Sequence, residues 1–74
     1  MDIQEFIVKF AEAIEVEKID ELTADTVFKE LEEWSSLSVM LLIAFFDDEF
    51  GREISEDAIG SANSIYDLYQ LATE

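Results

Sequence analysis

The chain of 74 residues contains no cysteine, no histidine and no proline. Without cysteine it has no disulfide, no thiol nucleophile and no thiolate ligand for a metal ion. Without histidine it lacks the general base of Ser-His and Cys-His catalysis, and it lacks imidazole metal ligands. These routes to catalysis and metal binding are therefore excluded within the chain itself.

Basic residues are also scarce. Four of them (Lys9, Lys18, Lys29 and Arg52) stand against 19 acidic residues and leave a net charge of −15. Binding to nucleic acid requires basic groups that displace counterions, and anionic membranes repel an acidic surface. We therefore exclude nucleic acid as a direct ligand and expect partners with basic patches. The alternative is that the acidity only keeps the protein soluble.

The longest apolar run, residues 37–46, is too short to cross a bilayer, and no signal peptide is visible. We therefore expect a cytoplasmic protein without a membrane span. The length predicts one small domain over residues 1–74. Half of the residues are hydrophobic, so a packed core is feasible despite the charge.

A first helix is predicted after Asp2, a favoured N-cap residue. Its apolar residues recur at helical spacing: Ile3, Phe6, Ile7, Phe10 and Ile14. Residues 17–33 are predicted to form a long irregular connection, and loops of this length are often functional. Its apolar anchors are expected to pack over the bundle: Ile19, Leu22, Val27, Phe28 and Leu31.

A second helix is predicted over residues 36–50, and Gly51 ends it because glycine tolerates positive φ. At 100° per residue, one arc of this helix is predicted to face the core: Val39, Leu42, Ile43, Phe46 and Phe50. A further apolar face points away from that arc: Leu37, Met40, Leu41 and Ala44.

Two shorter helical segments follow. The first is predicted to start after Ser55 and to end at Gly60. Ser64 is predicted to cap the last helix, with Asp67 as a short capping-box partner. The expected fold is all-α: a small four-helix bundle of three main helices and one short helix, with a long loop between helices one and two.

Ser35 and Ser36 stand together at the predicted start of the second helix. A serine N-cap stabilises a helix by about 1 kcal/mol relative to alanine, so one of the two is expected to serve as the cap. If Ser35 is the cap, Ser36 lies in the first turn, where the positive end of the helix dipole stabilises an attached phosphodiester. Local chemistry alone leaves open whether Ser36 is a cap or an attachment point.

Several segments together resemble the acyl carrier proteins: Phe28-Lys29-Glu30-Leu31, Trp34-Ser35-Ser36-Leu37, Asp47-Asp48-Glu49-Phe50-Gly51 and Ser64-Ile65-Tyr66-Asp67-Leu68. The resemblance covers nearly the whole chain. It implies that Ser36 carries 4′-phosphopantetheine and that Leu37 is the adjoining recognition residue. It also implies a non-catalytic, monomeric carrier of acyl thioesters in fatty-acid or related lipid or polyketide biosynthesis. The implied partners are a phosphopantetheinyl transferase and acyl-loading and condensing enzymes with basic docking patches.

The chain departs from the family at Ser35, where the family has aspartate, and no acid stands at Ser38 or Leu41. The acids of the second helix are displaced to Asp47 and Asp48, with Glu49 following. We expect Asp47 and Asp48 to bind partners, together with an exposed apolar patch: Leu37, Met40, Leu41 and Ala44. The alternative is that the loop or a later helix covers this patch.

The acids before Gly51 do not form a calcium loop, because the EF-hand spacing would place Phe46 at the first ligand position. No metal site is therefore predicted.

An unmodified acidic helical interaction module or polyanion mimic would also explain the charge, but it leaves the segment around Ser36 unexplained. Trp34 is expected to be a wedge between the loop and the bundle.

Overall fold

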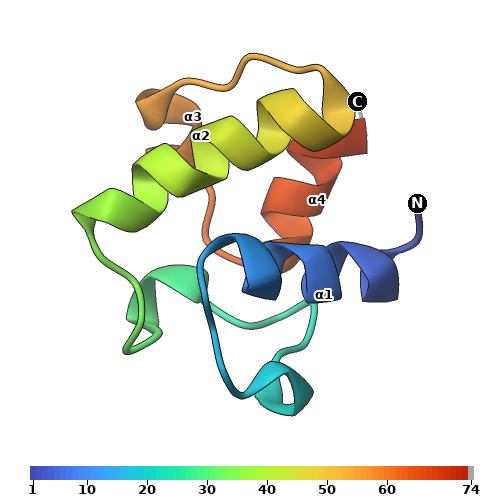
Figure 1. Ribbon diagram of the computed structural model, residues 1–74, viewed down its shortest axis with the longest axis vertical. Helices are drawn as coiled ribbons and strands as arrows, with labels where there is room; N and C mark the ends of the chain where they lie inside the picture. The colour runs from blue at the N-terminus through green and yellow to red at the C-terminus, as the bar shows by residue number, and fades with distance from the viewer. Residues whose placement is uncertain (74) are drawn as a thin grey trace.

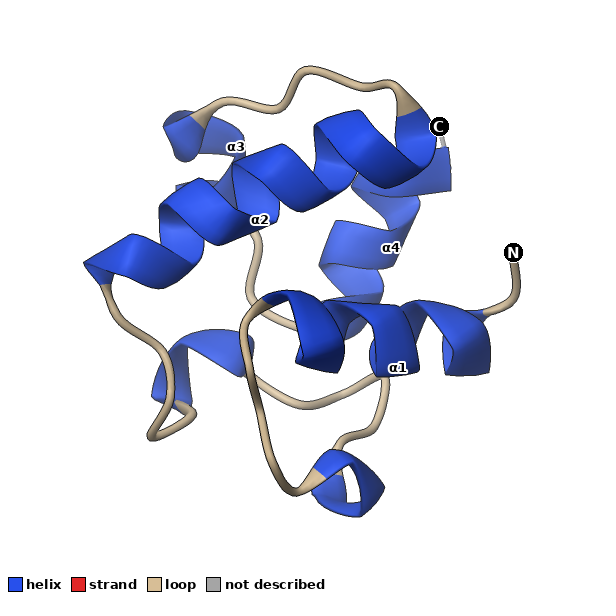
Figure 2. Ribbon diagram, viewed as in Figure 1, coloured by secondary structure: helices blue, strands red, loops and turns tan. Residues whose placement is uncertain are grey.

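The computed structural model describes residues 1–73, and within them the fold is all-α, as the sequence predicts (Figures 1 and 2). The four α-helices are α1 (Ile3–Ala13), α2 (Ser36–Phe50), α3 (Glu56–Ser61) and α4 (Ile65–Thr73). Two short 3₁₀ turns interrupt the loop between α1 and α2: η1 (Ile19–Glu21) and η2 (Phe28–Glu30). None of the helices in the described part of the chain has the length and apolar content needed to span a bilayer.

Phe6 lies at the centre of the core and is fully buried. Its ring centroid lies 5.4 Å from that of Tyr69 in α4 and 5.8 Å from that of Phe45 in α2. Phe46 and Phe50 lie 6.4 and 5.9 Å away. Aromatic pairs at such distances stabilise a core beyond the area that they bury. One side chain of α1 therefore joins three helices.

The loop between α1 and α2 is packed against the bundle. Phe28 is fully buried, with its ring centroid 6.2 Å from Phe10 in α1 and 5.0 Å from Trp34, just before α2. Farther back in the loop, the carbonyl of Thr26 accepts a hydrogen bond of 3.0 Å from the N–H of Ile65 in α4. The expected packing of the loop and the wedge role of Trp34 are therefore confirmed.

Local sequence signals set the helix ends. Asp2 caps α1 by accepting a 2.8 Å hydrogen bond from the N–H of Glu5. Gly51 ends α2 with a left-handed φ of 61°, which glycine adopts without strain. Gly60, in contrast, lies within α3 and does not end it. That helix ends one residue later, where the backbone becomes extended at the buried Ala62.

The face of α2 that is buried differs from the predicted arc. The buried residues are Ser38, Leu42, Phe45 and Phe46, whereas Val39, Ile43 and Phe50 are half-buried. The helix is thus rotated by roughly 70° from the prediction, at 100° per residue. The reason is tertiary: Phe45 contacts Phe6, which brings the flank of the helix to the core.

The loop anchors also need one correction. Leu22 and Phe28 are buried, and Ile19 and Leu31 pack partly against the core. Val27 was expected to be an anchor, but 41% of it is exposed. It joins the fold through its backbone, which forms an isolated β-bridge with Ser64.

The start of α4 has the predicted capping box. The hydroxyl of Ser64 accepts a hydrogen bond from the N–H of Asp67 at 3.2 Å. In return, the carboxylate of Asp67 accepts from the N–H groups of Asn63 (2.9 Å) and Ser64 (3.1 Å). These two backbone hydrogen bonds favour the charged form and lower the pKa of Asp67 below its ordinary value of 3.8.

We expect Phe6→Ala to reduce the free energy of unfolding by about 3–5 kcal/mol, because it empties a site that joins three helices. Urea denaturation measures this loss. Val8→Ala is the control on the same helix, since Val8 is 41% exposed and its truncation is expected to cost less than about 1 kcal/mol. Equal losses in the two variants would contradict the central position of Phe6.

The pKa of Asp67 gives stability a pH dependence. Because its folded pKa is lowered, the contribution of Asp67 is present above 3.8 and is lost as the pH falls through the folded value. We therefore expect wild type to be more stable than Asp67→Asn near neutral pH and the difference to shrink below about pH 4. Urea denaturation at constant ionic strength from about pH 6 to about pH 2.5 checks this. Asp25→Asn, at an exposed loop position, is the control for the loss of one negative charge.

Candidate functional site

The start of α2 is built by three serines with different tasks. Ser35 is the N-cap, with extended backbone angles (φ −149°, ψ 177°). Its N–H donates to the hydroxyl of Ser38 at 3.0 Å, and that hydroxyl donates to the carbonyl of Glu33 at 3.3 Å. Ser38 is only 2% exposed. The two flanking serines therefore do the structural work at this helix end.

Ser36 is the first residue of α2, and it is exposed. Among residues 1–73, no hydrogen bond uses its hydroxyl, so Ser36 is not the cap. The hydroxyl stands at the N-terminal end of the helix, where the dipole is positive. This position favours a negatively charged substituent on the oxygen.

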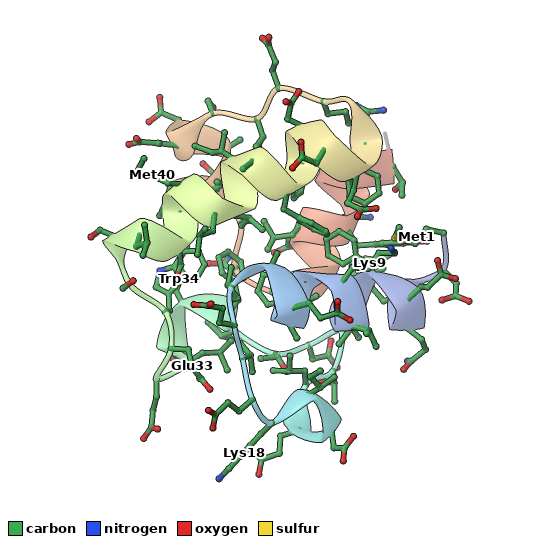
Figure 3. The ribbon with its side chains drawn as sticks, viewed as in Figure 1. Met1, Lys9, Lys18, Glu33, Trp34 and Met40 are labelled. Atoms are coloured by element: carbon green, nitrogen blue, oxygen red, sulfur yellow. The ribbon has the colours of Figure 1, made fainter. Side chains whose placement is uncertain are left out.

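A surface hollow of about 450 Å³ lies beside this hydroxyl. It is lined by Ser36, Leu37, Val39, Met40 and Glu56. Figure 1 shows α3, which contributes Glu56, beside the first half of α2. Met40 lies on the side of α2 that faces α3 (Figure 3). The hollow has walls of apolar side chains and one carboxylate at its border.

The predicted apolar patch is exposed for the most part. Leu37 and Met40 are 59% and 65% exposed, and Ala44 is exposed as well. Neither the loop nor a later helix covers these three residues. Leu41 differs from the expectation, because it is half-buried and packs against the core. The same rotation of α2 that buries Phe45 also turns Leu41 inward.

The acidic residues of α2 do not lie beside Ser36. Asp47 and Asp48 are exposed, but they follow Ser36 by 11 and 12 positions in one helix. At 1.5 Å per residue, they lie about 16–18 Å away along the helix axis. The first turn of α2 contains no acid. A partner that binds all the predicted residues must therefore extend along the whole helix.

Two contacts hold the segment before Ser36. The ring of Trp34 packs edge to face on the buried Phe28. The ammonium of Lys29 donates a 2.6 Å hydrogen bond to the carbonyl of Gly60 in α3 and lies 5.6 Å from the centre of the Phe28 ring. A hydrogen bond with a charged donor is stronger than a neutral one. The loop before Ser36 and the helix opposite it are thereby joined.

Sequence reasoning missed three participants: Ser38 as a capping partner, Glu56 at the border of the hollow, and Lys29 as the link to α3. Ser38 had a local signal, since it follows the N-cap by three positions, where a capping-box partner is found. Glu56 and Lys29 had none. Glu56 shares the hollow with residues 16 to 20 positions earlier, and Lys29 binds Gly60, 31 positions later, so only the tertiary fold brings them together.

Comparison with known proteins does not identify a relative: no protein-family model matches the chain, and neither the curated proteins nor the solved structures contain a significant match. The assignment of a function therefore depends on the chemistry of this site. The site presents a primary hydroxyl that takes part in no hydrogen bond among residues 1–73, and Glu56 is the one titratable residue that lines the hollow beside it. Such a hydroxyl is suited to accept a group that another enzyme transfers to it.

The division of tasks among the serines predicts different effects on stability. Ser38→Ala should reduce the free energy of unfolding by about 0.5–2 kcal/mol, because it leaves the N–H of Ser35 without its partner. Ser36→Ala should change it by less than about 0.5 kcal/mol, because the hydroxyl has no partner to lose. Thermal and urea denaturation compare the two. A larger loss for Ser36→Ala would show that Ser36 is the cap.

Proposed function

We propose that the protein is an acyl carrier protein, which holds acyl groups as thioesters on a 4′-phosphopantetheine arm attached to Ser36. The observation that carries the proposal is the exposed hydroxyl of Ser36 at the N-terminus of α2, beside a hollow with apolar walls. The resemblance of the surrounding sequence to acyl carrier proteins supports the same residue. The protein is a substrate and carrier for other enzymes, with no catalytic role of its own.

Attachment is a group transfer from coenzyme A, which a phosphopantetheinyl transferase catalyses. The oxygen of Ser36 forms a bond to the phosphorus that carries pantetheine, and the bond from that phosphorus to 3′,5′-ADP breaks. The hydroxyl proton passes to a base of the transferase. The product is a phosphodiester at the N-terminus of α2, where the positive end of the helix dipole stabilises its charge.

The arm supplies the thiol that the chain lacks, since the sequence has no cysteine. An acyl group bound to that thiol stays tethered, so each partner enzyme meets it at a high effective concentration. The hollow beside Ser36 offers apolar contacts to the arm and to a short acyl chain. The core residues Leu42, Phe46 and Ile59 are at most 2% exposed.

Partner enzymes are proposed to dock on the exposed part of the apolar patch, which consists of Leu37, Met40 and Ala44. Leu41 is half-buried and is not included. Charge complementarity favours partners with basic residues around an apolar contact, because the chain carries a net charge of −15. Asp47 and Asp48, at the far end of α2, are placed to pair with basic residues distant from the attachment site. Such pairing raises the rate of encounter more than the final affinity.

The proposal predicts that incubation with coenzyme A, Mg²⁺ and a broad-specificity transferase adds one phosphopantetheine to the chain. Ser36→Ala should abolish the addition, whereas Ser35→Ala should retain it, because Ser35 is only the cap. Intact-mass spectrometry measures the product. Circular dichroism confirms that both variants are folded.

Two outcomes would contradict the proposal. Addition to folded Ser36→Ala would place the arm on another residue. No addition to wild type with any of several transferases would favour the unmodified acidic interaction module.

A further inference from the structure

We propose that Glu56 of α3 supplies the carboxylate that a loading transferase pairs with when it modifies Ser36. The inference rests on the proposed function and adds a recognition residue from a different helix. Glu56 acts as a positioning residue, since it pairs with the transferase during docking and takes no part in the bond changes.

The distribution of charge around Ser36 points to this residue. Ser35 precedes the attachment residue, and the first turn of α2 contains no acid. The acids at the other end of the same helix lie about 16–18 Å away along its axis. Glu56 is exposed and lines the same hollow as Ser36, with Leu37, Val39 and Met40 as the other walls. It is therefore placed where a partner that approaches the hydroxyl meets it.

The chemistry of the donor explains why a carboxylate is useful here. Coenzyme A is a polyphosphate, and an enzyme that binds it must surround the phosphates with lysine, arginine or a metal cation. An acceptor hydroxyl must come within about 3–3.5 Å of the phosphorus, next to those cations. A carboxylate beside the hydroxyl pairs with one of them and fixes the approach. Pairs of this kind set orientation and the rate of encounter.

Glu56 is held in position by the fold. Ser55 caps α3 by accepting a hydrogen bond of 3.1 Å from the N–H of Ala58. Ile59, three residues after Glu56, is buried in the core. At the other end of α3, the carbonyl of Gly60 accepts the hydrogen bond from Lys29. Lys29 belongs to the loop that leads into α2. Its hydrogen bond therefore holds α3, which carries Glu56, against the loop that precedes Ser36.

Steady-state kinetics of loading tests the proposal, with the full chain as the acceptor and coenzyme A as the donor. Glu56→Gln should raise the KM for the chain about tenfold and change kcat by less than about twofold, because the lost pair acts in docking. Asp57→Asn is the matched control, since Asp57 is the next residue of α3, is exposed and does not line the hollow. It should stay within about twofold of wild type.

A second variant distinguishes recognition from folding. In Ser35→Asp/Glu56→Gln, a carboxylate returns next to Ser36 from the cap position, where aspartate is an equally good cap. We expect the KM of this double variant to fall most of the way back to the wild-type value. Added salt should raise the KM of wild type more than that of Glu56→Gln, since it screens the pair.

The proposal is overturned if wild type is loaded and Glu56→Gln has the same KM, a result that leaves the carrier function intact. It is also overturned if Asp57→Asn is impaired as much as Glu56→Gln, because the effect is then one of net charge. Failure of wild type to be loaded at all would remove the proposed function and this inference with it.

Discussion

A continuous line of aromatic contacts determines this fold and the position of its site. Phe6 joins α1 to α2 and α4, Phe10 lies on the same helix, and Phe28 connects Phe10 to Trp34. Chains of this length bury only about 60% of their unfolded surface, so a few large side chains must provide much of the stability. Here those side chains also fix the loop that leads into α2.

The constraint on the loop explains why Ser36 remains free. Trp34, packed on Phe28, fixes where α2 begins, and the serines on either side of Ser36 complete the helix end. Ser36 is left at the first helical position without a structural task. The contact between Phe45 and Phe6 sets the rotation of α2, which leaves Leu37 and Met40 exposed around the hollow. Stability and the presentation of the hydroxyl thus depend on the same contacts.

Signals that are local in the sequence predicted the fold well. The cap at Asp2, the left-handed Gly51 and the Ser64–Asp67 capping box each depend on residues that are neighbours in the sequence. The bounds of α2 are predicted correctly because both of its ends have such local signals. Two features that depend on contacts between distant segments were not predicted. Helical periodicity placed the buried face of α2 at Val39 and Ile43, because it contains no information about Phe6. Glu56 was missed because no pattern in the sequence relates it to Ser36.

The central claim is that one exposed hydroxyl, at Ser36, is the point where a prosthetic group is attached. Fragmentation mass spectrometry of the protein isolated from the cells that produce it naturally tests this most directly, because the modification is then read without an added enzyme. The account predicts a phosphopantetheine on the peptide that contains Ser36, with the fragment ions placing it on that residue. A chain that is unmodified under all growth conditions, or a group located on another residue, would contradict it.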